Sequence, residues 1–419
     1  MAGRVTPSAC GSGPPTATAP RIGALQLYVM MEEVEPREPA MTQVLTLLPA
    51  ALAIAGCAMA TAAPPPDRVF DTEQASFRVV EVVRGLEHPW ALAFLPDGRM
   101  LVTERPGRLR LVVDGQLVPE PVAGVPAVFA RGQGGLLDVV ADPDFARNEL
   151  IYLSYAHDTD GDRTTRVLRG RLEGTALTES EVIFDGLPRT GGSNHFGSRL
   201  AFGPDGMLYV AMGERQDPDR SQDLAQHPGK LMRIAPDGAV PADNPFVGRA
   251  DARPEIYSYG HRNPQGLAVR PETGQIWLHE HGPRGGDEVN LIRAGANYGW
   301  PVITHGRAYS GLPIGEGSAK PGMEQPVHYW VPSIAPSGMA FYAGTAFPEW
   351  QGDLLVGALR SELLVRLELV GDRIVAEERM LQGELGRIRD VRVGPDGLVY
   401  LLTDENPGGL YRLEPAATN

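Results

Sequence analysis

The stretch L-A-F-L-P-D-G-R-M-L-V-T-E at Leu92–Glu104 returns as L-A-F-G-P-D-G-M-L-Y-V-A-M-G-E at Leu200–Glu214 and as V-R-V-G-P-D-G-L-V-Y-L-L-T-D-E at Val391–Glu405. Each copy is an apolar run, a Pro-Asp-Gly turn, and a second apolar run that ends in an acidic or small polar residue. Because Pro presets φ and Gly supplies a positive φ, each copy predicts a β-hairpin. A hairpin repeated at long intervals indicates a repeat architecture.

Weaker copies fill the gaps between these three, at Gly135–Tyr155, Gln265–Glu280 and Ser337–Ala358. Such repeats cannot bury their apolar faces singly, whereas four-stranded blades closed in a ring leave only short edges. The sequence therefore predicts an all-β, six-bladed β-propeller over residues 67–419. The expected starts of its repeats are Pro89, Gly135, Ser198, Gln265, Ser337 and Ile388.

Composition agrees with this class and excludes others. The 50 Gly and 38 Pro are dispersed, as turns between many short strands require. A formal net charge of −14, with Lys230 and Lys320 as the only lysines, argues against a nucleic-acid partner. Both cysteines, Cys10 and Cys57, precede the repeats, so we expect neither a disulfide nor thiol chemistry in the propeller.

The first 66 residues are interpreted as a targeting segment and linker. Val44–Gly56 has the length of a signal-peptide core and is too short to span a bilayer. Processing is expected either at an A-x-A type site near Ala58–Ala63 or by lipid attachment at Cys57, whose I-A-G-C context resembles a lipobox. Met41 is a candidate for the true start, and a simple tail is the alternative. We expect export to the periplasm, with membrane contact only through a lipid on Cys57.

Unusual polar residues flank the predicted first strands, where propeller loops converge on one end of the channel. They are Gln133, Asn194, His195, Arg199, His261, Arg262, Asn263, Arg360, Arg387 and Arg389. Four of these arginines, at 262, 360, 387 and 389, would repel one another unless an anion lay between them, which predicts a polyanionic small ligand. The alternative is that each arginine pairs with an Asp of a neighbouring blade, such as Asp138, Asp287 or Asp390.

Several motifs, in order through about Glu81–Leu413, resemble the soluble PQQ-dependent aldose (glucose) sugar dehydrogenases, which are six-bladed quinoproteins. They are G-Q-G-G-L-L-D-V, N-H-F-G-S-R-L-A-F-G-P-D-G, Y-G-H-R-N-P-Q-G-L-A, E-H-G-P-R-G-G-D-E-V-N-L-I, G-x-N-Y-G-W-P, P-S-G-M-A-F-Y and R-I-R-D-V-R-V-G-P-D-G. The form N-H-F-G-S-R is closer to the broad-specificity aldose branch, because glucose dehydrogenase carries an Asp before its His.

The resemblance implies PQQ, whose three carboxylates and ortho-quinone suit an arginine-rich site. By family position its contacts are Gln133, Arg262, Asn263, Tyr309, Arg360, Arg387 and Arg389. Arg360 replaces a family Lys, which keeps the charge but changes the geometry. His195 matches the family's general base, although an isolated loop His is more often structural, and Arg262 would stabilise charge on the quinone oxygen.

The resemblance also implies Ca²⁺, bound through the main chain of Gly282 and Pro283. A further calcium is expected at Glu288 and the Tyr298 region, because calcium takes carboxylate and carbonyl oxygens. The alternative for Glu288 and Asp287 is a turn paired with an arginine. The H-E-H of His279 and His281 suggests zinc, but no further zinc ligands are evident in the sequence.

The expected activity is oxidation of aldoses at C1 to lactones, with electrons passed to an external quinone or cytochrome, by a monomer or homodimer. No nucleotide-binding or serine-hydrolase motif is present in the sequence. Two other classes stay open. A calcium-dependent lactonase-type propeller would want several acidic ligands and no arginine cluster, and a non-catalytic binding propeller would be expected to lose His195 or the Arg387 and Arg389 pair.

Overall fold

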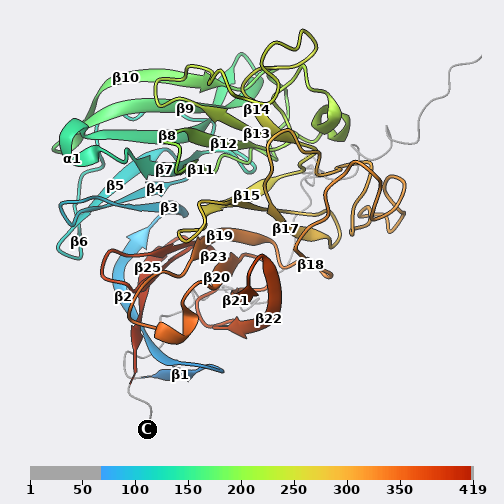
Figure 1. Cartoon of the computed structure of the whole chain (residues 1–419). Helices are drawn as coiled ribbons and strands as arrows, with labels where there is room; N and C mark the ends of the chain where they lie inside the picture. Colours follow the sequence, from blue (N-terminus) through green and yellow to red (C-terminus); the bar gives the residue numbers. More distant parts are fainter. Residues whose placement is uncertain (1–67, 417–419) are drawn as a thin grey trace, which may run out of the picture. The chain divides into compact units, whose positions relative to one another are not determined.

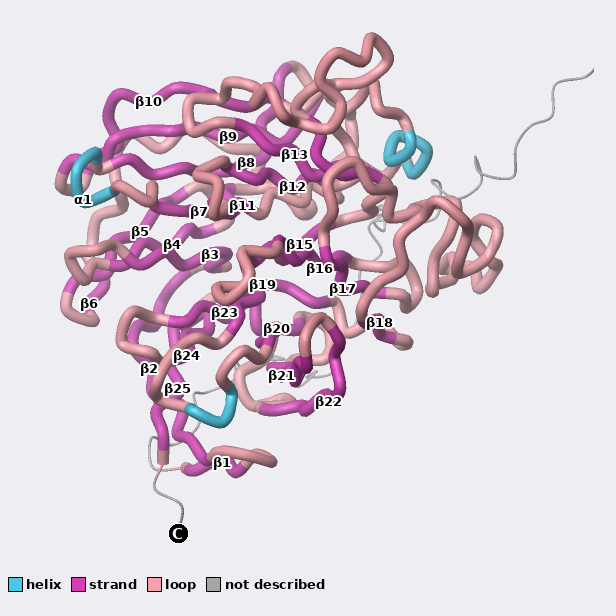
Figure 2. Tube along the Cα trace, in the orientation of Figure 1, coloured by secondary structure: helices cyan, strands magenta, loops and turns pink. Residues whose placement is uncertain are grey.

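Twenty-five strands form six antiparallel sheets in the computed structural model, which describes residues 68–416 (Figure 2). Regular helix in that range is limited to the short elements α1 (Phe145–Asn148), η1 (Pro218–Gln222) and η2 (Pro348–Trp350), and no described helix is long and apolar enough to cross a bilayer. The predictions for the leader, including Cys57 and Met41, lie outside the described residues.

Five sheets contain four strands each, in chain order from the innermost strand outward. The first two are β3 (Pro89–Phe94), β4 (Met100–Glu104), β5 (Arg108–Val113), β6 (Gln116–Leu117), and β7 (Leu136–Ala141), β8 (Leu150–Thr159), β9 (Asp162–Glu173), β10 (Ala176–Asp185). The third is β11 (Leu200–Phe202), β12 (Leu208–Met212), β13 (Lys230–Ile234), β14 (Ile256–Tyr259). The fourth and fifth are β15 (Pro264–Val269), β16 (Ile276–Glu280), β17 (Asp287–Leu291), β18 (His328–Trp330), and β19 (Pro336–Phe341), β20 (Leu354–Ala358), β21 (Leu363–Val370), β22 (Arg373–Met380).

The sixth sheet joins both ends of the described chain. Its order is β1 (Val69–Asp71), β2 (Ser76–Leu86), β25 (Gly408–Pro415), β24 (Val399–Thr403), β23 (Ile388–Val393). Strand β2 therefore supplies the fourth strand of the last blade by pairing antiparallel with β25, from Phe77 opposite Pro415 to Leu86 opposite Gly408 (Figure 1).

The innermost strands close into a ring, because β3, β7, β11, β15, β19 and β23 each contact the next and β23 contacts β3. The prediction of a six-bladed β-propeller is confirmed, and the six innermost strands begin within two residues of the expected repeat starts.

The predicted hairpin turns explain the local geometry. Gly98, Gly206 and Gly397 have φ of +87°, +73° and +80°, as the Pro-Asp-Gly turns require.

The second strand of a blade lies between neighbouring blades on both faces. Five of these strands, β4, β12, β16, β20 and β24, are accordingly buried at every residue.

A balanced cluster of charges fills part of the propeller axis. Arg199 lies 3.4 Å from Asp138 and 3.0 Å from Asp390, and Arg392 lies 3.1 Å from Asp138 and 3.0 Å from Asp390. These residues belong to the second, third and sixth blades, so contacts between them cross the channel. Asp138 and Asp390 are thus paired with Arg199 and Arg392, and not with any of the four arginines at 262, 360, 387 and 389 for which such pairing was the alternative.

Candidate active site

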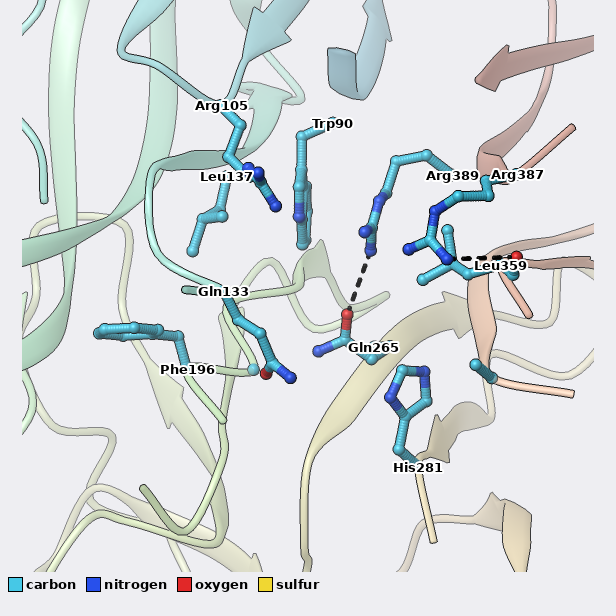
Figure 3. A pocket seen from close by; sticks show the side chains of 12 residues that line it. Trp90, Arg105, Gln133, Leu137, Phe196, Gln265, His281, Leu359, Arg387 and Arg389 are labelled. Atoms are coloured by element: carbon cyan, nitrogen blue, oxygen red, sulfur yellow. Dashed lines mark hydrogen bonds between the residues drawn. The ribbon is translucent and has the colours of Figure 1, made fainter. Parts of the chain in front are cut away.

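A cavity of about 180 Å³ opens beside this axial cluster, many times the roughly 15 Å³ that one water needs. Its twelve lining residues come from loops and strands of all six blades: Trp90, Arg105, Gln133, Leu137, Phe196, Gly197, Gln265, His281, Ala335, Leu359, Arg387 and Arg389. Figure 3 shows the guanidinium groups, the two amides and His281 directed toward one space beside the Trp90 ring. The cavity therefore combines hydrogen-bond donors with aromatic faces.

Three arginines give the cavity a positive charge. Arg389 contacts Asp404 at 2.7 Å, and the more exposed Arg387 lies 3.4 Å from the same carboxylate oxygen. Within residues 68–416 the guanidinium of Arg105 has no hydrogen bond or ion pair, and the buried Nε of Arg389 has no partner. One carboxylate thus faces three guanidinium groups, which leaves the cavity suited to an anion.

Amide side chains connect the arginines to the opposite wall. The Gln265 oxygen accepts a bond from Arg389 at 3.4 Å, and its Nε2 donates to Asn263 at 3.2 Å. The Oε1 of Gln133 accepts bonds from Asn263 at 3.5 Å and from the backbone N–H of His195 at 2.9 Å. A continuous network therefore runs from the arginines to His195.

His195 is held by a carboxylate. Its Nδ1 lies 2.5 Å from Oε2 of Glu214, a residue that is almost fully buried. Burial lowers the pKa of His195, and the Glu214 charge opposes that shift only in part. Although burial alone would raise the pKa of Glu214, His195 and then Arg262 hold it below its usual range. The ring is therefore neutral near pH 7, with its proton on Nδ1 and Nε2 able to accept one.

The backbone of this segment is unusual. His195 has a φ of +55°, a left-handed conformation that a residue with a side chain rarely adopts. A Cβ on Gly213 would lie 2.3 Å from the His195 carbonyl oxygen, so a glycine is required there for the two segments to approach. The N–H bond to Gln133 and the Glu214 contact together fix the imidazole beside the cavity.

A second, smaller cavity adjoins the first and shares His281 with it. Arg262 lines it and donates from Nη1 to the carbonyl oxygens of Gly282 at 2.9 Å and His281 at 3.1 Å. His281 in turn bonds through Nε2 to the Pro336 carbonyl at 2.7 Å, and burial lowers its pKa to about 3, so its ring is neutral.

Two carboxylates meet in the smaller cavity. Glu280 and Glu288 are directly opposite in the β16–β17 pairing, and both line it. Burial and the Glu280 charge raise the pKa of Glu288 well above its usual range. The neighbouring Asn290 has a buried side-chain oxygen without a partner. Like charges at opposite positions are unfavourable unless a cation or a proton lies between them.

The profile of the family described as "Glucose / Sorbosone dehydrogenase" matches residues 86–412. The chain belongs to the glucose/sorbosone dehydrogenase family. The match spans the six blades described above, and it confirms the resemblance found in the sequence motifs.

Three relatives illustrate the family. The aldose sugar dehydrogenase YliI of Escherichia coli (strain K12) is 48% identical over 343 residues, which cover 80% of this chain and 92% of that protein. A crystal structure of a glucose dehydrogenase is 52% identical with a TM-score of 0.79, covering 81% of this chain and 99% of that one. The PQQ-bound aldose sugar dehydrogenase from Streptomyces coelicolor is 33% identical with a TM-score of 0.68, covering 82% and 99%.

The site residues predicted from the family resemblance are divided between the two cavities and the surface of the protein. Gln133, Arg387 and Arg389 line the main cavity, and Asn263 bonds to two of its lining residues. Gly282, Glu288 and Tyr298 line the smaller cavity with Arg262. Arg360 is exposed, and Tyr309 is 57% exposed; neither lines the main cavity.

Two of the predicted calcium ligands are engaged in other ways. The Gly282 carbonyl already accepts a bond from Arg262. The Tyr298 hydroxyl donates to Leu291 at 2.7 Å and accepts from the Arg293 N–H at 2.9 Å, which leaves only the main chain of Tyr298 for a metal. Asp287 pairs with no arginine in the described part of the chain; it accepts bonds from Gly282, Ser333, Ile334 and Ala335, and so holds the 282–286 loop.

Sequence reasoning did not select Trp90, Arg105, Gln265 or Glu214 as site residues. A signal was present for Glu214, because it is the acidic residue that ends the second apolar run of a repeated hairpin. Asp404 follows the end of the corresponding strand in the sixth blade. Arg105 directly follows Glu104, which ends that strand in the first blade, but a lone arginine in a turn has no distinguishing pattern.

Proposed function

We propose that this protein is a PQQ-dependent dehydrogenase that oxidises aldoses at C1 to lactones. The names of its relatives support a sugar dehydrogenase, and one related structure is described as PQQ-bound. The observation that carries the proposal is the excess of cationic donors in one cavity: three guanidinium groups face a single carboxylate, Asp404.

The residues of the main cavity fit PQQ. A flat trianion needs cationic forks for its carboxylates, amide donors for its carbonyl oxygens and an aromatic face, which Arg105, Arg387, Arg389, the two glutamines and Trp90 supply. The buried, unpartnered Nε of Arg389 is a donor that such an anion satisfies. Arg262 and Asn263 extend this donor set, with Tyr309 and Arg360 as the outer contacts implied by the family.

His195 is the proposed general base. Glu214 fixes the proton of its ring on Nδ1, so Nε2 takes the proton of the C1 hydroxyl. PQQ, when bound, supplies the acceptor for the hydride that leaves C1. Arg262, already buried beside two carbonyl oxygens, adds positive charge at this end of the site.

Calcium is part of the proposal. Glu280 and Glu288 bring two carboxylates to the smaller cavity, which Thr304 also lines, and such oxygens suit a hard cation. At Gly282 and Pro283 a cation would lie beside Arg262, so the guanidinium would have to share the Gly282 oxygen. Within residues 68–416 no group of three His, Cys, Asp or Glu side chains is arranged to hold a metal, so carbonyl and amide oxygens would complete either site. Calcium bound at Gly282 and Pro283 would orient and polarise the cofactor.

The proposed setting is the periplasm, after export through the segment before residue 67, with electrons passed to an external quinone or cytochrome. A lactonase-type hydrolase is the second candidate from sequence, but the arginine excess in the cavity favours an anionic cofactor over a carboxylate-bound catalytic metal.

The proposal is tested by adding PQQ to the purified apoprotein with Ca²⁺ and following both cofactor absorbance and aldose-dependent dye reduction. We expect saturable binding at one PQQ per chain and activity that requires PQQ. Arg105→Gln should weaken binding roughly tenfold or more, since it removes an unpaired charge from the cavity, whereas Arg373→Gln on the outer strand β22 should not. Activity of PQQ-free protein, or equal binding by both variants, would contradict the assignment.

A further inference from the structure

An exposed patch of cationic and apolar side chains lies beside the active-site mouth. We call it the 284/307 patch; it consists of Arg284, Arg307, Leu312, Tyr329 and Val331, all of which are exposed. Arg307 and Leu312 lie in the connection between β17 and β18, Tyr329 lies in β18, and Val331 follows it. This region extends from the ring in Figure 1. Exposed aromatic and aliphatic side chains gathered with arginines are typical of protein interfaces.

Backbone contacts hold this patch together. Arg284 and Arg307 exchange N–H to carbonyl bonds of 2.9 and 3.3 Å, and Gly286 donates to Trp330 at 2.8 Å. Tyr329 stacks on His305 with ring centroids 3.9 Å apart. A Cβ on Gly285 would lie only 3.3 Å from Val331. The backbone that carries the patch is therefore held in place, which lowers the ordering cost of meeting a partner.

The charges of the patch are not neutralised locally. Neither Arg284 nor Arg307 has a carboxylate partner among the described residues. Two acidic residues of the same connection are already paired, Glu316 with Lys320 and Glu324 with Arg293, both at 2.8 Å. On a chain with a formal net charge of −14, this is a locally positive surface.

The patch is continuous with the site. Arg284 belongs to the 282–286 loop, whose Gly282 and Gly286 line the smaller cavity with Arg262. His281, immediately before this loop, lines both cavities. A partner seated on the patch therefore covers a loop that contacts the reacting end of the proposed site.

We propose that the 284/307 patch docks a small acidic electron-carrier protein, and this rests on the proposed dehydrogenase function. Charge complementarity selects the occupant, because two unpaired arginines favour a partner with clustered carboxylates. A second copy of the chain packed through the same patch about a twofold axis would place arginine against arginine, which is unfavourable.

The electron balance is compatible with such a partner. Oxidation of an aldose to its lactone removes two electrons and two protons; the protons go to solvent, with His195 taking the first. Each ferric haem carrier accepts one electron and becomes ferrous. Two carriers must therefore visit in turn for each sugar oxidised, so a fast and weak docking surface suits the reaction.

The test uses two forms of one acceptor, mitochondrial cytochrome c, which is basic, and its succinylated form, which is acidic but retains the haem. Reduction is followed with the PQQ- and Ca²⁺-loaded enzyme and saturating glucose at low and high salt. We expect the succinylated form to be reduced faster, and Arg284→Gln with Arg307→Gln to slow it roughly ten- to hundredfold at low salt and little at high salt. Arg373→Gln, at an exposed arginine of β22, is the matched control and should have no such effect.

Reduction of a small neutral quinone separates the two proposals. If wild type and the double variant reduce it equally but differ on succinylated cytochrome c, the patch is the docking surface. If they do not differ on the cytochrome, or if the basic form is the better acceptor, the docking proposal is wrong. If no acceptor is reduced, the dehydrogenase proposal fails, and direct binding of oxidised succinylated cytochrome c to wild type and double variant still tests the patch.

Discussion

Arg387 and Arg389 lie two residues apart and contact the same carboxylate, yet the structure predicts different effects on replacement. Arg389 has a side chain that is 8% exposed and lies 2.7 Å from Asp404, whose side chain is 6% exposed. Arg387 is 41% exposed and lies 3.4 Å from the same oxygen. We therefore expect Arg387→Gln to affect ligand binding alone and Arg389→Gln to affect both binding and folding.

The magnitudes follow from burial. Removing one partner of a buried ion pair costs about 3–5 kcal/mol, because the other charge is left uncompensated. Arg387 still compensates part of the Asp404 charge when Arg389 is replaced. We therefore expect Arg389→Gln to lower the free energy of unfolding of the apoprotein by the lower end of this range, about 3 kcal/mol. An exposed pair contributes about 0–1 kcal/mol, which bounds the effect of Arg387→Gln. For PQQ binding, each loss of a charged hydrogen bond should cost roughly 1.5–3 kcal/mol.

The assay is urea unfolding of each apoprotein together with a PQQ titration of the folded protein. The pH dependence adds a signature. Although burial alone would raise it, Arg389 and Arg387 hold the pKa of Asp404 below its usual range. The stabilisation that comes from this depressed pKa is fully present above the pKa of Asp in the unfolded chain, about 3.9, and it is lost as the pH falls toward the pKa of Asp404 in the folded protein. The free energies of unfolding of wild type and Arg389→Gln should therefore converge below about pH 4. Equal stability of the two variants at pH 7, or unchanged PQQ affinity in Arg387→Gln, would refute this reasoning.

Other outcomes test the catalytic residues, the metal and the leader. His195→Gln should lower kcat on the order of 10²–10⁴-fold while PQQ still binds; activity within a few-fold of wild type means that another group is the base. Burial places the pKa of His195 below its ordinary value of about 6.5, and Glu214→Gln removes the charge that raises it, so the acid limb of kcat/KM should move to lower pH; a shift to higher pH contradicts the pairing. Chelation of calcium should abolish dye-linked activity, and Glu288→Gln should raise the calcium concentration needed for half-activity roughly tenfold or more; full activity in excess chelator excludes the metal. Mass analysis of the native N-terminus should show a start after Cys57 or a diacylglyceryl Cys57, and an intact Met1 or Met41 in the cytosol is the opposing result.

The fold was predictable because its information is local. Each Pro-Asp-Gly turn carries its own hairpin, and the left-handed φ of Gly98, Gly206 and Gly397 is what the turn chemistry requires. The pairing of β2 with β25 was not predictable in the same way, because the two strands are separated by over three hundred residues and no turn joins them to specify their register.

The site was predictable only in part. Gln133 and His195 stand in motifs that a family resemblance identifies. Glu214 and Asp404 contact residues fifteen to nineteen positions earlier in the chain. Both follow the second strand of a repeated hairpin, but that pattern does not identify the residues they contact, which follow from the blade geometry. Arg105 reaches the cavity because the first blade borders the sixth around the ring, a relationship that no local pattern contains.

The pairing of β2 with β25 also makes the order of synthesis matter. Strand β2 is synthesised before β3, and its partner β25 comes last among the described strands. Until then one edge of β2 and one edge of β24 are open, so the nascent protein carries two templates for incorrect strand pairing. A translational pause placed just before residues 408–415 should prolong this exposure. An extension placed after Pro415 should not, because β25 has then already left the ribosome and can complete the ring.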